Sequence, residues 1–277
     1  MKRVLSGVMC AIAVAGCAGA ELGAGGAELD VDVDDGVALG AAAGARGQAA
    51  LTSAIQHVFV IVMENHGATD IYGNAASAPY LTNTIAPIAG RASNFVDPLP
   101  SLPSEPHYIW MEAGTNALPD HTFTTDNNPS ASNSTASTAH LSTQITAAGA
   151  TWLSYQEGIN TTTGACPIAG SGNYAPKHDP FIFFRDVSGA TPSKTNAFCA
   201  AHHKPITALA TDLANNTVAA YNFITPNLCH DMHSNTCAGS ADPILQGDTW
   251  LSQNVPAILS YAAAHQGVLL IVWDEPV

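Results

Sequence analysis

The chain has 277 residues and a formal net charge of −14; 11% of its residues are charged and 47% are hydrophobic. This composition is typical of a globular protein and not of a disordered one. From about residue 54 onward there are sixteen Asp and Glu but only five basic residues, which are Arg91, Lys177, Arg185, Lys194 and Lys204. Nucleic-acid binding needs a basic surface, so we expect no nucleic-acid partner.

The N-terminus is predicted to be a targeting segment. Two basic residues, Lys2 and Arg3, precede an apolar run over 4–15 that is too short to span a bilayer as a mature helix. The run ends in a Val-Ala-Gly-Cys sequence that resembles the lipobox of bacterial lipoproteins. We therefore predict a signal peptide over 1–17 and lipidation of Cys17, which makes the protein an exported lipoprotein of the cell envelope whose only membrane contact is the lipid anchor. An ordinary secretory signal and a secreted protein are the alternative.

Residues 18–53 are rich in Gly, Ala and Asp and are expected to form a flexible tether. Asp30, Asp32 and Asp34 alternate as in a calcium loop, but the Gly and the closing Glu of an EF-hand are missing from their places. Residues 54–277 contain no internal repeat, so a single domain is the simplest interpretation of this part.

Apolar runs and helix signals alternate along that domain. The region over 97–135 is instead rich in Pro, Ser, Thr and Asn, and we expect a long irregular stretch there, of the kind that often has a function. The pattern predicts strands over 57–63, 152–155, 218–224 and 268–273, and helices over 80–89, 138–148, 205–215 and 248–265. Such alternation predicts an α/β fold in which helices sandwich a mostly parallel sheet.

Four cysteines follow the predicted signal peptide. An even number in an exported chain favours two disulfides. A bridge between Cys229 and Cys237 would close a tight loop, so we pair these two, and Cys166 with Cys199. Three connectivities are formally possible. A zinc site built from these cysteines is the alternative, although the sequence has no C-x-x-C.

Two of the predicted buried strands end in adjacent oxygen ligands. Glu64 and Asn65 follow the first strand, and Asp274 and Glu275 follow the last. Ligands in open α/β sheets collect at the carboxyl ends of the strands, so the two pairs could meet at one divalent cation, whose identity the pattern does not specify. Taken alone, each pair is also compatible with an ordinary strand end.

Further polar candidates lie in the loops. Asp231 and His233 form a D-x-H arrangement after another buried strand, which is typical of metal and phosphate sites, although a polar surface loop is the alternative. His178 precedes an aromatic run over 181–184, and a lone histidine in such a place is more often packed than catalytic.

The run over 58–66 resembles the opening of the bacterial phosphoesterase family, which holds secreted acid phosphatases and phosphatidylcholine-type phospholipases C and is related to the alkaline phosphatase superfamily. Stretches similar to the acid phosphatase branch are 103–106, 109–114, 147–152, Tyr155, 174–178, 226–233, 247–250 and 273–275. The resemblance covers about 57–275. It implies an alkaline-phosphatase-like α/β/α sandwich and a metal-dependent acid phosphatase acting on small phosphate monoesters. A phospholipase C-type phosphodiesterase that takes a phospholipid headgroup, and an inactive binding lipoprotein or fragment, are the alternatives.

The resemblance also implies roles for individual residues. The metal ligands would be Glu64, Asn65, Asp274 and Glu275, and the polar residues around the phosphate would be His107, His178, Asp231 and His233. The nucleophile would lie on the first turn of the helix before 147–149, where backbone amides would also hold the phosphate.

Alignment without gaps places His140 at the nucleophile position, and a small shift places Thr138 there. As the alternative, His140 caps the helix and binds phosphate without attacking it. Many relatives have His-Pro-Ser where Leu102-Pro-Ser stands here, and they often have Asn in place of His107.

Family domains normally continue past the Asp-Glu pair, whereas only Pro276 and Val277 follow here, so we expect a C-terminally incomplete domain with an exposed sheet edge. Because Lys and Arg are scarce, histidines are expected to balance part of the phosphate charge, which predicts an acidic pH optimum.

Overall fold

The computed structural model describes residues 55–159, 165–234, 236–237 and 241–276, together with the backbone of 11–15. The predicted tether over 18–53 and most of the predicted signal peptide lie outside the described residues. Among the described residues, no helix combines the length and the apolar character that crossing a membrane requires.

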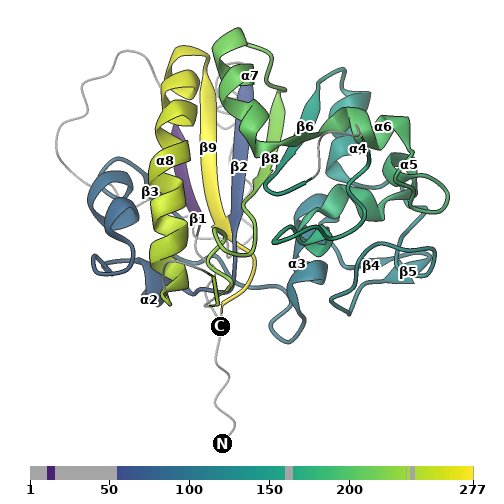
Figure 1. The fold of residues 1–277 in the computed structure, drawn as a ribbon, viewed down its shortest axis with the longest axis horizontal. Coiled ribbons are helices and arrows are strands. Elements are labelled where there is room, and N and C mark those ends of the chain that lie inside the picture. Colours follow the sequence, from purple (N-terminus) through teal and green to yellow (C-terminus); the bar gives the residue numbers. More distant parts are fainter. Residues whose placement is uncertain (1–10, 16–54, 160–164, 235, 238–240, 277) are drawn as a thin grey trace, which may run out of the picture.

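Five parallel strands form the centre of the sheet (Figure 1). Their spatial order is β9 (Gly267–Trp273), β2 (His57–Met63), β8 (Tyr221–Thr225), β6 (Trp152–Gln156) and β7 (His203–Pro205). All neighbouring pairs among them run parallel, so their carboxyl ends share one edge. The predicted strands over 57–63, 152–155, 218–224 and 268–273 are thereby confirmed, within three residues at their ends.

Two further strands lie antiparallel beyond β9, namely β1 (Ala11–Ala15), which pairs with β9, and β3 (Gly90–Arg91), which pairs with β1. The sequence pattern placed residues 11–15 in a signal peptide outside the fold, whereas their backbone pairs here with 268–272. A two-stranded hairpin of β4 (Ala117–Leu118) and β5 (His121–Thr122) is separate from the main sheet.

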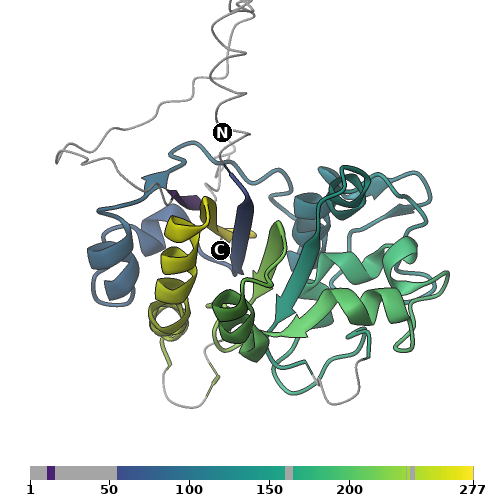
Figure 2. The ribbon, with the colours of Figure 1, turned by 90° about the horizontal axis from the view of Figure 1, so that it is seen from above.

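Helices cover both faces of the sheet (Figures 1 and 2). They are α2 (Ala68–Ile71), α3 (Ser104–Ala113), α4 (Leu141–Ala147), α5 (Arg185–Ser188), α6 (Ala197–His202), α7 (Leu209–Asn215) and α8 (Pro243–Ala264). Short helical turns also occur at Leu81–Ile85, Pro176–His178, Pro180–Phe183 and Ile206–Ala208. This arrangement confirms the predicted α/β/α sandwich.

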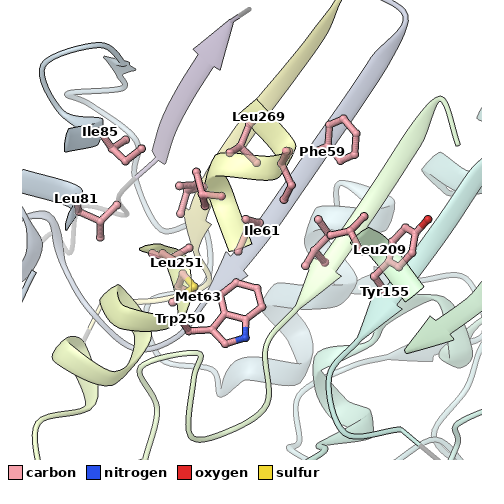
Figure 3. Packing of buried hydrophobic residues seen from close by; sticks show 14 of the residues in the cluster. Phe59, Ile61, Met63, Leu81, Ile85, Tyr155, Leu209, Trp250, Leu251 and Leu269 are labelled. Carbon is pink, nitrogen blue, oxygen red and sulfur yellow. The ribbon is translucent and has the colours of Figure 1, made fainter. Parts of the chain in front are cut away.

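Alternate side chains of β2 enter two separate cores, as the period of a strand requires. Ile61 and Met63 are fully buried in one core against Trp250 and Leu251 of α8 (Figure 3). Val62 belongs to the other core, in which α3 and the turn Pro180–Phe183 pack against the opposite face. The sheet is therefore buried on both faces, which explains the continuous apolar run of this strand.

Helix α8 begins five residues earlier than predicted. Asp242 caps it, because its side chain accepts a hydrogen bond of 3.1 Å from the amide of Leu245. Asp248, which was predicted to lie near the helix start, instead accepts hydrogen bonds from the amides of Tyr80 and Leu81 at 2.8 and 2.9 Å. It anchors the short turn Leu81–Ile85, which stands where a longer helix over 80–89 was predicted.

The prediction of an irregular stretch over 97–135 is wrong in one respect, because α3 lies within it. The helix is hard to recognise from the sequence, because Pro106 falls in its first turn and seven of its ten residues are buried. No exposed polar face therefore marks the helical period. The helix predicted over 138–148 is shorter than expected, Leu141–Ala147, and Gly149 follows it at a φ of +76°.

Both predicted disulfides are confirmed. Cys166 bridges Cys199 with a Cα–Cα distance of 5.2 Å, and Cys229 bridges Cys237 at 5.6 Å. The alternative of a zinc site at these cysteines is therefore wrong. The second bridge closes the loop that carries Asp231 and His233.

Candidate metal centre and active site

Acidic residues converge at the carboxyl edge of three neighbouring strands. Glu64 follows β2, Asp274 follows β9, and Asp231 lies in the loop after β8. Backbone hydrogen bonds fix these strand ends to one another: the amide of Glu64 donates to the carbonyl of Asp231 at 2.7 Å, and that of Asp274 donates to the carbonyl of Met63 at 3.1 Å. The fold thus brings together side chains that are more than 200 residues apart in the sequence.

The two strand-end pairs form one cluster. Glu64, Asp274 and Glu275 each offer a carboxylate oxygen, and these oxygens lie within 4.8 Å of one another. The side-chain amide of Asn65 donates to Glu64 at 3.3 Å and to Glu275 at 3.1 Å, while its backbone amide donates to Asp274 at 3.1 Å. Asn65 has a φ of +52°, a left-handed conformation that Asn tolerates better than most residues, so the turn itself favours this residue type.

The cluster buries negative charge without a basic partner. Glu64, Asp231 and Asp274 are all 0% exposed. Burial raises the pKa of each carboxyl well above its usual range, and the neighbouring carboxylates raise it further. Among the described residues, no Lys or Arg forms an ion pair with any of the three. Buried carboxylates in such surroundings need either protons or a cation.

Several buried ligand atoms of this cluster have no partner among the described residues, and their chemistry fits a divalent cation. Within the described part of the chain, Glu64 Oε1, Asp231 Oδ2, Asp274 Oδ2 and His178 Nε2 are buried and have no hydrogen-bond partner. Buried polar atoms in proteins are nearly always paired. Carboxylate oxygens and an imidazole nitrogen are ligands for divalent metals, so the donor set fits such an ion.

Ser104, which sequence reasoning missed, is part of this cluster. It is the first residue of α3, and its hydroxyl donates to Glu64 Oε2 at 3.0 Å and to Glu275 Oε1 at 3.1 Å. It therefore orients one carboxylate from each strand-end pair. The available signal was its place in the 103–106 stretch that resembles the phosphoesterases.

His178 also belongs to the cluster, although its sequence context favoured a packing role. Its Nε2 lies 3.2 Å from Glu64 Oε1, and its Nδ1 lies 3.5 Å from Asp231 Oδ2. The ring stacks on Tyr108 of α3, with 4.9 Å between the ring centroids. Burial, with Lys177 and His233 nearby, holds the pKa of His178 well below its usual range, so the imidazole is neutral and able to act as a ligand.

An open cleft of about 380 Å³ adjoins the cluster. His233 is exposed there, and the residues that line the cleft include Asn65, His66, Met232, His233 and Glu275. Met232, between Asp231 and His233, has a φ of +78°, which is a strained conformation for this residue type. The cleft gives a small molecule access to Glu275, the carboxylate of the cluster that lines it.

His107 has a different environment from the one that the resemblance implies. Its Nε2 lies 2.9 Å from Asp97 Oδ1, and its Nδ1 lies 2.9 Å from the carbonyl of Pro103. Both ring nitrogens are therefore engaged, and the ring connects the loop before α3 to the first turn of that helix. It supports the helix that carries Ser104, and its contacts are not with the cleft.

His140 lies in a separate cluster of buried charges. Its ring is stacked on Phe184, with Nδ1 2.9 Å from Glu112 Oε1 and Nε2 3.0 Å from Asp186 Oδ2. Burial opposes the charged form of His140, but the hydrogen bonds to Asp186 and Glu112 outweigh it and raise its pKa to about 9. The amide of Ser142 donates to Glu112 at 2.8 Å, so Glu112 occupies the N-terminus of α4, where the resemblance implied a phosphate.

The structure therefore does not bring His140 to the metal centre. Glu112, its partner, lies eight residues after Ser104 in α3, which corresponds to about 12 Å along the helix axis. Thr138 is exposed in the segment that precedes α4.

Comparison with known protein families gives a match. The family model described as the phosphoesterase family matches residues 98–276. No match is found among curated proteins. Glu64 and Asn65 precede the matched segment, but their contacts with Ser104, Asp274 and Glu275 join them to it. With a match of this extent around the clustered carboxylates, the chain belongs to the phosphoesterase family.

Proposed function

We propose that this protein is a metal-dependent acid phosphatase, a phosphoesterase that hydrolyses small phosphate monoesters. The observation that carries the proposal is the set of buried, unpartnered ligand atoms around Glu64, beside a cleft of about 380 Å³ that Asn65 and Glu275 line. A cleft of this volume lies within the usual range for small-molecule sites.

Glu64, Asn65, Asp274 and Glu275 would hold the cation. When bound, a divalent ion acts as a Lewis acid that polarises the phosphoryl oxygens. Ser104 contributes by holding Glu64 and Glu275 in a fixed orientation. His233 lines the cleft with an exposed ring and can donate an N–H to a phosphate oxygen or to the leaving oxygen.

We favour water as the nucleophile. Attack by His140 would require it to release Asp186 or Glu112, because both of its ring nitrogens are engaged. In the water reaction, the new P–O bond forms as the bond to the leaving group breaks, and the leaving oxygen takes up a proton. Attack by His140 or Thr138 stays a prediction of the resemblance. Rapid-mixing measurements distinguish the two routes, since a covalent phosphoenzyme would give a burst of product that His140→Gln or Thr138→Ala abolishes.

The activity is tested with p-nitrophenyl phosphate, bis(p-nitrophenyl) phosphate and phosphatidylcholine, each with chelator and after addition of Mg²⁺, Mn²⁺, Ca²⁺ or Zn²⁺. We expect release from the monoester, loss of activity with chelator, and recovery with at least one metal. Asp274→Asn should be inactive, and Asp186→Asn, in the His140 cluster, is the matched control that should remain active. Preference for phosphatidylcholine would assign a phospholipase C activity instead. Activity that survives complete chelation would contradict metal dependence.

A pH–rate profile tests the acidic optimum.

We further propose that the protein is exported, with Cys17 as its lipidated residue. Two disulfides support this proposal, because such bonds persist in oxidising compartments. Radiolabelled palmitate should label the wild type but not Cys17→Ser in a bacterial host. Equal labelling of both would contradict lipidation, and retention in the cytoplasm would contradict export.

A further inference from the structure

Two groups of ligand atoms meet at the strand ends, and they share one residue. Glu64, Asp274 and Glu275 form the first group, and Glu64, His178 and Asp231 form the second. In each group, the three ligand atoms lie within 4.8 Å of one another. The two groups have only Glu64 in common.

The two oxygens of Glu64 have different surroundings. Oε2 accepts hydrogen bonds from Ser104 and Asn65, the residues that also bind Glu275. Oε1 lies 3.2 Å from His178 Nε2 and has no hydrogen-bond partner among the described residues. Oε2 therefore shares its hydrogen-bond donors with Glu275, whereas Oε1 lies beside His178, and a carboxylate that bridges two metal ions has its oxygens divided in this way.

Each residue of the second group has one buried ligand atom without a hydrogen-bond partner among the described residues. Glu64 Oε1, His178 Nε2 and Asp231 Oδ2 are all buried, and none has a hydrogen-bond partner in the described part of the chain. The residues are at most 2% exposed, so bulk water does not satisfy them. Three ligand atoms of this kind, all without partners, are the arrangement that a metal ion would complete.

The formal charge also favours a second cation. Glu64, Asp231, Asp274 and Glu275 contribute four negative charges when ionised. Lys177, whose charge acts on Asp231, is itself paired with Asp126. One divalent ion would leave two negative charges in a largely buried cluster, whereas two ions would neutralise it.

A direct phosphate contact is a poorer role for these residues. Asp231 has a carboxylate oxygen that is unpartnered among the described residues. A phosphate placed against it would bring two negatively charged groups together, and like charges repel. His178 is buried and does not line the cleft, whereas His233 lines it and is exposed. His233 is therefore the better candidate for contact with the phosphate.

We propose that Glu64, His178 and Asp231 form a second divalent-cation site, with Glu64 bridging it to the first. The inference rests on the proposed function, because it places a second ion in the same catalytic centre. One imidazole and two carboxylates suit Zn²⁺ or Mn²⁺ better than Ca²⁺ or Mg²⁺. Paired ions about 3.5–4 Å apart stabilise both the attacking and the leaving oxygen in phosphoryl transfer.

Metal stoichiometry tests this inference without reference to activity. The full chain, free of any histidine tag, is stripped with chelator and dialysed against Mn²⁺ or Zn²⁺, and bound metal is counted by native mass spectrometry and elemental analysis. We expect two ions per chain in the wild type and one in His178→Ala and in Asp231→Asn. His233→Ala, the neighbouring histidine outside the group, should retain two. Circular dichroism checks that each variant is folded.

Electron paramagnetic resonance of the Mn²⁺ form gives an independent readout, since two ions bridged by Glu64 show exchange coupling that the single-site variants lose. A wild type with one ion, or a His178→Ala variant that keeps two, would overturn the second site. If the wild type binds one ion and its phosphatase activity is sensitive to chelator, the second site is refuted and the proposed function is unaffected. Phosphatase activity without any bound ion would contradict both proposals.

Discussion

The chain buries two clusters of acids with histidine, one around Glu64 and one around His140, and they differ in how completely they are paired. His140 contacts Glu112 and Asp186 through its two ring nitrogens, and the hydroxyl of Thr143 donates to Asp186 at 2.9 Å. Around Glu64, several buried ligand atoms have no partner among the described residues. The His140 cluster is complete as the protein folds, and the Glu64 cluster is not.

The difference separates a structural role from a functional one. A paired cluster, once buried, stabilises the helices that contribute to it, because removing one member leaves the others uncompensated. An unpaired cluster costs stability, and such a cost is common where a site is shaped for a ligand. We therefore expect substitutions around His140 to change stability and substitutions around Glu64 to change activity.

The largest effect is expected for Glu64→Gln. The phosphatase rate should fall on the order of 1000-fold, because a charged ligand shared by both metal sites is lost. The metal-free protein should at the same time become more stable, by about 1 kcal/mol, since one buried carboxylate charge is removed. Steady-state kinetics and urea unfolding in chelator measure the two effects. A variant that loses activity and stability together would contradict the comparison.

His140→Ala should lower the stability of the protein and leave its activity nearly unchanged, which is the opposite of the Glu64→Gln result. Loss of the ring leaves Glu112 without its charged partner, and we expect the free energy of unfolding to fall by about 3 kcal/mol. The metal content should be unchanged, and the rate per folded molecule should stay within a few-fold of the wild type. Chemical denaturation and metal analysis test this. Loss of activity in a folded protein would instead support His140 as the nucleophile.

The pH dependence of stability follows from the same histidine. Burial opposes its charged form, but hydrogen bonds to Asp186 and Glu112 raise its pKa from the ordinary value of 6.5 to about 9 in the folded protein. A raised pKa contributes stability that is fully present below about pH 6.5 and is lost as the pH rises through about 9. The loss approaches about 3 kcal/mol at 1.36 kcal/mol per pKa unit. The difference between wild type and His140→Gln in urea midpoints, followed from pH 6 to 10, isolates this contribution. A difference that is constant with pH would refute the assignment.

A smaller effect is expected for Gly247→Ala in α8. A Cβ at this position would lie 2.4 Å from Met232 Cγ and 3.0 Å from the carbonyl of His230, so the loop with Asp231 would have to move. We expect a loss of about 1–2 kcal/mol in stability and a reduced rate. Gln253 is exposed on the same helix, so Gln253→Ala is the control and should change neither the stability nor the rate. Wild-type activity in Gly247→Ala would show that this loop position is not important for the site.

Much of the metal centre could be predicted from the sequence, because strand ends follow from local patterns. The runs before Glu64 and Asp274 are continuously apolar, and parallel pairing places their ends at one edge. The D-x-H motif and the two disulfides were likewise recognisable from position and spacing. Family resemblance supplied the phosphoester chemistry, which the residues alone did not specify.

Tertiary contacts account for what the sequence did not predict. Ser104 was missed because α3 has neither a polar face nor a regular period. His178 had an ambiguous local context, and only its distances to Glu64 and Asp231 place it in the cluster. For His140, alignment suggested a nucleophile, whereas its partners come from helices that a linear pattern does not bring together.

The central claim is that the cluster around Glu64 is a cation site, and anomalous diffraction tests it most directly. Crystals of the full chain grown with Mn²⁺ should show an anomalous peak within bonding distance of Glu64, Asp274 and Glu275, and a second one beside His178 and Asp231. Substitution Glu64→Gln should weaken or remove both. A well-ordered Glu64 with no anomalous density around it, at saturating Mn²⁺, would contradict the account.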